Sequence, residues 1–451
     1  MKRIGSRASI VYLVVAVFVI LTGIYIYKLS ADGDKWATYP TNRHLYTNGK
    51  LTKSGTVTDR NGIVLASNVD GARSYNEEKS IRLATVHTIG DFSGNIATGV
   101  ISAYRKELTG FDFVNGTYSY KNGGNDITLT IDANLCVTAR KALGNHSGTI
   151  GVYNYKTGEI LCMVSNPSFD PANTNGTPKG EGVYLNRLLS GQYTPGSVFK
   201  IVTAISALEN ISDVDSMTFT CDKGCEVAGE WVECSGNHGT LNFDDALAKS
   251  CNAAYAQLAL ELGEKNLYAT ANGLGFNKEW QMGKVSTKKS VYRLEYPSTV
   301  NFAWSAIGQS TDIVNPYHFM MLMGAIANGG ETPRPYVVED ITTSIGLPAQ
   351  IDLLKKNESM LDSEIATRID EMLRYNVTSN YGDDRFPNLE MCGKTGTAQV
   401  DDKEATSWFA GYSKRADKPY AIVVVAEEGG YGITTAGSIA NKVLQSAPTV
   451  D

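Results

Sequence analysis

An apolar run free of charged residues stands near the start of the chain, from Ala8 to Tyr27. About twenty such residues are long enough to cross a bilayer as a helix. Three basic residues precede the run, and a positive flank predicts a cytoplasmic N-terminus. No convincing small-residue cleavage site follows, which favours an uncleaved anchor over a cleaved signal peptide. We therefore expect a cytoplasmic tail over residues 1–7, a single-pass membrane anchor over residues 8–28, and everything later outside the cytoplasmic membrane.

Residues 29–125 are polar and contain short apolar segments of the length of strands. Asp59-Arg60-Asn61-Gly62 lies between two such segments and is a turn signal. We expect a small, mostly β or α+β module here, a stalk or dimerisation-like domain.

From residue 126 the pattern changes to clear strands and helices, and we treat residues 126–451 as a second domain. Strands, then a block of helices, then strands and a final helix predict an α+β sandwich. The expected strands cover residues 127–131, 150–155, 159–165, 407–413 and 420–426, and the expected helices 133–143, 197–208, 244–262, 317–328 and 436–445.

The composition is that of an ordinary globular protein, with 42% hydrophobic and 20% charged residues. The formal net charge of −6 gives no reason to expect a nucleic-acid partner.

The segment Thr194-Pro195-Gly196-Ser197-Val198-Phe199-Lys200 places a serine and a lysine one helical turn apart, directly after a helix-breaking Pro-Gly. A serine hydroxyl needs a base to become a nucleophile, and a lysine three residues later lies on the same helix face. The lysine can act as that base if burial and neighbouring cations keep it neutral. The free N–H groups at a helix start can also hold an oxyanion.

Two further motifs follow in the order that serine acyltransferases of this type use: Ser250-Cys251-Asn252, then Lys394-Thr395-Gly396 with Thr397 after it. Each motif is weak alone, because the chain repeats it elsewhere. Ser286-Thr287-Lys288-Lys289 copies the first and Lys156-Thr157-Gly158 the third, but the latter reads as a turn between two strands.

With these motifs in order, the chain resembles class B penicillin-binding proteins, the monofunctional peptidoglycan D,D-transpeptidases. Asp59-Arg60-Asn61-Gly62 is similar to a box near the N-terminus of that family. The segments Ile307-Gly308-Gln309 and Trp408-Phe409-Ala410-Gly411 also resemble stretches on either side of its Lys-Thr-Gly motif. The resemblance implies the penicillin-binding transpeptidase and serine β-lactamase-like fold, with a five-stranded antiparallel sheet between helical layers.

The resemblance also implies roles for these residues. Ser197 would be the nucleophile that β-lactam antibiotics acylate, Lys200 its base, and Ser250 a proton relay to the leaving D-alanine. Asn252 would bind the substrate and position Lys200. The backbone N–H groups of Ser197 and Thr397 would form the oxyanion hole. The strand residues that would bind the terminal carboxylate of the peptidoglycan stem peptide are Lys394, Thr395, Gly396 and Thr397.

Three other activities stay open. A D,D-carboxypeptidase would use water in place of the acceptor amine. A β-lactamase needs a deacylating base, typically a glutamate, and we locate no motif for it. A catalytically inactive scaffold for cell-wall assembly is the third. The resemblance implies partners among the membrane proteins of cell-wall assembly and no cofactor for catalysis.

Seven cysteines are present, and three of them crowd together with a histidine as Cys221, Cys225, Cys234 and His238. Three thiolates and an imidazole suit tetrahedral zinc, and the short intervals fit a structural site. A disulfide is the competing interpretation outside the cytoplasm. We expect a zinc ion on these four residues, with Asp222 as a reserve ligand.

Overall fold

A computed structural model of the protein describes residues 2–37, 46–47, 50–51, 54–69, 72–110, 124–173, 178–343, 345–350, 356–400 and 403–450. Parts of the expected stalk module, such as residues 111–123, lie outside the described residues.

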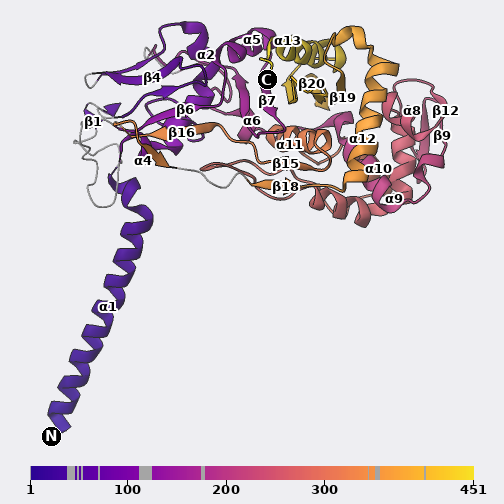
Figure 1. Ribbon diagram of the computed structural model, residues 1–451. Coiled ribbons are helices and arrows are strands. Elements are labelled where there is room, and N and C mark those ends of the chain that lie inside the picture. Colours follow the sequence, from indigo (N-terminus) through magenta and orange to yellow (C-terminus); the bar gives the residue numbers. More distant parts are fainter. Residues whose placement is uncertain are drawn as a thin grey trace.

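The first helix, α1 (Lys2–Ala37), extends away from the rest of the protein as a separate rod (Figure 1). Its segment Arg7–Gly33 is long and apolar enough to cross a membrane. Among the described residues, no other helix meets this criterion. Its apolar side chains are exposed, with Leu13 at 65% and Phe18 at 68%. Burial in lipid would remove this surface from water, which fits a membrane anchor.

Five antiparallel strands form the central sheet, in the order β19-β20-β21-β7-β8. Every residue of the three strands β21, β7 and β8 is buried, so helices must cover both faces. Helices α2, α5 and α13 lie above the sheet in Figure 1, and α11 lies below it. The predicted α+β sandwich is confirmed. The bounds are β7 (Gly148–Asn154), β8 (Ile160–Asn166), β19 (Met391–Val400), β20 (Lys403–Ser413), β21 (Tyr420–Ala426), α2 (Lys79–Ile89), α5 (Ala133–Leu143), α11 (Pro316–Ala327) and α13 (Ser438–Ser446).

A second sheet of six strands, in the order β17-β16-β6-β3-β4-β5, joins distant parts of the chain. The turn after β3 is fixed by the fully buried carboxylate of Asp59, which accepts the N–H groups of Asn61, Ile63 and Ala133 at 2.8 to 3.0 Å. Because Ala133 begins α5, this turn is tied to the helix that covers the central sheet. The strands are β3 (Val57–Thr58), β4 (Val64–Val69), β5 (Ala72–Tyr75), β6 (Asp126–Leu129), β16 (Val338–Thr342) and β17 (Pro348–Gln350).

The helix predicted over residues 244–262 is wrong in one respect, because it is two helices. Helix α8 (Phe243–Ala248) and helix α9 (Asn252–Gly273) are separated by three residues. Between them Ser250 has a φ of +54°, a left-handed conformation that no helix contains. The break therefore falls on a residue that the motif analysis selects.

The other elements connect these layers or cover the helical side. They are α3 (Val100–Ala103), α4 (Arg105–Leu108), α6 (Arg187–Ser190), α7 (Lys200–Asn210), α10 (Thr299–Ile307), α12 (Ser363–Asn376), β1 (Tyr46–Thr47), β2 (Lys50–Leu51), β9 (Phe219–Cys221), β10 (Gly224–Val227), β11 (Glu230–Glu233), β12 (Gly239–Leu241), β13 (Gln281–Met282), β14 (Val285–Ser286), β15 (Glu331–Pro333) and β18 (Asn357–Ser359).

Candidate active site

Ser197 and Lys200 lie on one continuous helical stretch. A 3₁₀ turn over Gly196–Phe199 carries the serine and runs directly into α7, whose first residue is the lysine. Ser197 is half-buried, whereas the Lys200 side chain is completely buried. A buried lysine beside an accessible serine is the arrangement that a serine nucleophile with a lysine base requires.

Gly196 brings this turn against the edge of the central sheet. Its φ is +58°, and a Cβ at this position would lie only 2.9 Å from the carbonyl oxygen of Thr397. Its N–H donates to the carbonyl of Gly308 at 2.9 Å. The close approach therefore requires glycine, and it holds the backbone of Ser197 next to that of Thr397.

The Lys200 ammonium is surrounded by oxygens of the Ser-x-Asn motif. Its Nζ donates to the carbonyl of Ser250 at 2.5 Å and to Oδ1 of Asn252 at 2.7 Å, and it lies 3.2 Å from the Ser250 hydroxyl. The Nζ of Lys394 donates to the same hydroxyl at 3.0 Å. Residues that are far apart in sequence, from all three motifs, thus meet at one serine oxygen. Backbone strain of the kind seen at Ser250 is common at functional sites.

Both lysines have a lowered pKa. Burial lowers the pKa of Lys200 to about 7, and the positive charge of Lys394 acts in the same direction. Burial also lowers the pKa of Lys394 to about 7. A neutral amine near pH 7 can accept a proton, so the environment of Lys200 meets the condition for a general base.

Strand β19 lies at the edge of the sheet, so every second residue directs its N–H and C=O groups away from β20. The N–H of Thr395 donates to the Tyr381 hydroxyl at 3.0 Å, which shows that Thr395 is one of these residues. Thr397, two residues later, has the same orientation, and its carbonyl accepts from Gln309 at 3.3 Å. The N–H of Thr397 therefore faces the side on which Ser197 lies.

The copies of these motifs lie in unsuitable places. Ser286 is exposed on the short strand β14. Lys289 is also exposed, and it does not lie in a helix. Lys156 is exposed in the turn between β7 and β8. Neither copy has the buried lysine that distinguishes the site at Ser197.

A second group of side chains lies beside the start of α9. The ligand atoms of Cys221, Cys234, His238 and Cys251 all lie within 4.8 Å of one another. The Nδ1 of His238 is 3.5 Å from the Cys234 sulfur and 3.7 Å from the Cys221 sulfur, and the Cys234 and Cys251 sulfurs are 3.9 Å apart. Spacing alone could not identify Cys251, which is the middle residue of the Ser-x-Asn motif.

The expected ligand set therefore needs one correction. Cys225 is not in the group, because its strand pairing in the β10–β11 hairpin directs its sulfur toward the carbonyl of Ala253, at 3.6 Å. The reserve residue Asp222 accepts a hydrogen bond from Asn237 at 2.8 Å.

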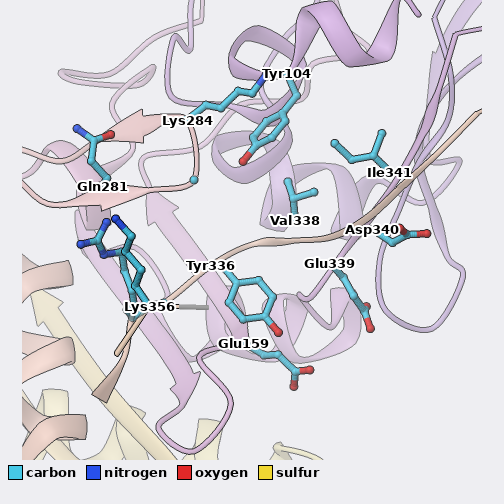
Figure 2. A pocket seen from close by; sticks show the side chains of 13 residues that line it. Tyr104, Glu159, Gln281, Lys284, Tyr336, Val338, Glu339, Asp340, Ile341 and Lys356 are labelled. Atoms are coloured by element: carbon cyan, nitrogen blue, oxygen red, sulfur yellow. The ribbon is translucent and has the colours of Figure 1, made fainter. Parts of the chain in front are cut away.

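A cavity of about 410 Å³ lies elsewhere, between the six-stranded sheet and the β13–β14 hairpin (Figure 2). Its described lining contains no Ser, Thr, Cys or His. Two of its cations are already paired, Lys284 with Glu107 and Arg334 with Glu358. It lacks the nucleophile and the base that the site at Ser197 combines.

Comparison with known proteins agrees with this geometry. Stage V sporulation protein D of Bacillus subtilis is 29% identical over 351 residues, which are 72% of this chain and 53% of that protein, so the chain spans about half of its length. Peptidoglycan D,D-transpeptidase PbpA of Mycolicibacterium smegmatis is 25% identical and aligns over 96% of this chain and 95% of its own.

Solved structures show the same fold. A D,D-transpeptidase domain from Eggerthella lenta matches 87% of this chain over 97% of its own length, with 28% identity and a TM-score of 0.74. The ceftriaxone acyl-enzyme of penicillin-binding protein A from Mycobacterium tuberculosis matches 88% of this chain over 98% of its own length, with 21% identity and a TM-score of 0.78. Residues 148–445, which include all three motifs, match the family "Penicillin binding protein transpeptidase domain", and the chain belongs to that family.

Proposed function

We propose that this protein is a peptidoglycan D,D-transpeptidase that works through an acyl-enzyme on Ser197. The observation that carries the proposal is the contact of Lys200, Ser250 and Lys394 at one hydroxyl, with Ser197 on the turn that runs into the helix of Lys200. The names of the relatives support the same reaction.

In the first step the Ser197 oxygen attacks the carbonyl between the two terminal D-alanines of a donor stem peptide. Lys200 accepts the serine proton, and the N–H groups of Ser197 and Thr397 stabilise the oxyanion. The amide bond then breaks as Ser250 gives its proton to the departing nitrogen and takes in return the proton held by Lys200, and free D-alanine leaves. Lys394, Thr395 and Thr397 bind the terminal carboxylate during this step, and Asn252 binds the peptide and positions Lys200.

In the second step an amine of another stem peptide attacks the ester carbonyl. The new amide bond forms and the Ser197 oxygen leaves. The proton lost by the amine goes to that oxygen, which restores the serine hydroxyl. β-Lactam antibiotics are attacked in the same way, and their ring opens without losing a leaving group.

The competing reaction is hydrolysis of the acyl-enzyme, which would make the protein a D,D-carboxypeptidase. Incubation with a synthetic stem pentapeptide and an excess of an acceptor amine distinguishes the two. A transpeptidase gives the amide product together with released D-alanine, and a carboxypeptidase gives tetrapeptide. A folded protein that shows neither acylation by penicillin nor turnover of either kind would favour the scaffold role.

We also propose that α1 anchors the chain in the cell membrane as a single pass, with its basic N-terminus in the cytoplasm. The catalytic part would then lie outside the membrane, where its substrate is. Membrane proteins of cell-wall assembly are the expected partners.

The second part of the proposal is a structural zinc site on Cys221, Cys234, His238 and Cys251. A tetrahedral zinc with bonds of about 2.3 Å to sulfur and about 2.0 Å to nitrogen separates its ligands by roughly 3.5 to 3.8 Å. The distances of 3.5, 3.7 and 3.9 Å among these atoms fit that geometry. The group is largely buried, as structural sites are.

Zinc would support the catalytic motif directly. The Cys234 sulfur accepts the N–H of Asn252 at 3.2 Å, and the Cys251 sulfur caps α9 by accepting the N–H of Ala254 at 3.5 Å. Metal analysis of full-length protein purified without added zinc tests the site. One zinc per chain with no mass deficit under denaturing conditions supports it, whereas no metal and the loss of two hydrogens would establish a disulfide.

A further inference from the structure

Tyr381 is a residue that the motifs do not include, yet it contacts the middle of the Lys-Thr-Gly strand. It ends a π-helical turn, Val377–Tyr381, that follows α12. Its hydroxyl accepts the N–H of Thr395 at 3.0 Å and lies 2.8 Å from Oγ1 of the same threonine. Single π-turns within helical segments are frequent at functional sites.

Either oxygen of the Tyr381–Thr395 hydroxyl pair can be the donor, and one arrangement of the protons leaves the Thr395 proton available to a substrate. In that arrangement the Tyr381 oxygen accepts the backbone N–H of Thr395, and its own single proton points to Oγ1 of the same threonine. When Thr395 accepts that proton, its own hydroxyl proton is directed elsewhere. A carboxylate can only accept hydrogen bonds, so a threonine that binds one has to be the donor.

The π-turn is rigidly connected to both motifs across the site. The side-chain amide of Asn376 donates to the carbonyl of Gly393 at 2.7 Å, one residue before Lys394. The amide of Asn380 donates to the carbonyl of Ala248 at 2.7 Å, two residues before Ser250. The segment that carries Tyr381 thus holds the strand at a fixed distance from the Ser-x-Asn motif.

We propose that Tyr381 is a positioning residue for substrate recognition, which makes Thr395 a hydrogen-bond donor to the terminal carboxylate. It also occupies the edge N–H of Thr395, so that an incoming peptide pairs with β19 only from Thr397 onward. This inference rests on the proposed function, because it assumes that Thr395 binds a carboxylate.

The test compares Tyr381→Phe with Tyr375→Phe, the same change one turn and a half earlier in the same segment. The Tyr375 hydroxyl donates to Asp245 at the surface and touches no motif residue. Both full-length variants are titrated with penicillin G and with its methyl ester, which lacks the carboxylate. For Tyr381→Phe we expect roughly tenfold slower acylation by the acid, the effect of one lost hydrogen bond to a charged group, and unchanged acylation by the ester.

A double variant makes the test independent of general damage to the fold. Thr395→Val removes the hydroxyl that Tyr381 orients, so it should show the same loss with the acid alone, and adding Tyr381→Phe should change nothing further. Equal losses with acid and ester, additive losses in the double variant, or wild-type rates for Tyr381→Phe would overturn the inference. If wild-type protein is not acylated at all, the proposed function has failed instead.

Discussion

The Nζ atom of Lys394 donates a hydrogen bond to the hydroxyl of Ser250 at 3.0 Å. Ser250 is also the residue whose carbonyl accepts from Lys200, so one strained residue connects the two buried lysines. Burial favours the neutral form of both amines near neutral pH, and the positive charge of Lys394 adds to this effect at Lys200. In the proposed mechanism, substrate binding by Lys394 would therefore be coupled to proton transfer by Lys200.

The first prediction concerns the nucleophile. Ser197→Ala should abolish labelling by a fluorescent penicillin, because no other hydroxyl stands one turn before a buried lysine among the described residues. Ser286→Ala is the matched control, because Ser286 belongs to the same Ser-x-x-Lys pattern but lies on an exposed strand. This variant should be labelled normally. Persistent labelling of Ser197→Ala would show that another residue is acylated.

The second prediction concerns the base. Lys200→Ala should slow acylation by about 10²–10⁴-fold while the protein stays folded, since this is the usual contribution of general-base catalysis. Stopped-flow or gel-based acylation rates measure it, and circular dichroism checks the fold. A folded variant with near-normal rates would remove Lys200 from the mechanism.

The third prediction is a pH dependence. The pKa of Lys200 is lowered to about 7, mainly by burial and then by Lys394, so the reactive neutral amine is lost as the pH falls below 7. Acylation should rise by about tenfold per pH unit below the apparent pKa of the pair and level off above it. A profile that first rises near pH 10 would show that the lysine has its ordinary pKa in the protein.

The fourth prediction separates the zinc ligands. Cys234→Ser should lower both the zinc content and the melting temperature, and it should slow acylation because the Cys234 sulfur holds the backbone of Asn252. Cys225→Ser should leave the zinc content, the melting temperature and the acylation rate unchanged, because this cysteine lies outside the group. Loss of zinc in the Cys225 variant would restore the ligand set expected from sequence spacing.

The fifth prediction uses two glycines with similar φ angles. Gly196→Ala introduces a Cβ 2.9 Å from the Thr397 carbonyl, whereas Gly144→Ala, at a φ of +63°, meets no atom within 4 Å. Both variants should lose stability, because each glycine has a positive φ that a residue with a Cβ rarely adopts. Only Gly196→Ala should also slow acylation, because it pushes the nucleophile away from β19. Equal acylation rates in the two variants would show that this close approach is not needed.

Much of the site was predictable because its signals are local. The spacing of Ser197 and Lys200 follows from helix periodicity, and the order of the motifs excluded the copies at Ser286 and Lys156. The strands predicted at 407–413 and 420–426 are likewise present, within β20 and as β21.

What the sequence could not predict depends on tertiary contacts. The segment around Ser250 has helical composition on both sides, so nothing local indicates a left-handed residue held by contacts with Lys200 and Lys394. Cys251 joins the sulfur group, and Cys225 leaves it, because a hairpin packs against α9. Tyr381 contacts Thr395 from fourteen positions earlier in the chain, a distance at which no periodicity connects them.

The six-stranded sheet has a consequence for how this chain can be divided. Strand β6 lies between β3 from its N-terminal side and β16 from residues 338–342. A fragment that begins at residue 126 would keep every motif, but it would uncover a whole edge of β6 and remove the Asp59 carboxylate from the start of α5. The shortest piece of this protein that can react with penicillin should therefore be considerably longer than the piece that contains its chemistry.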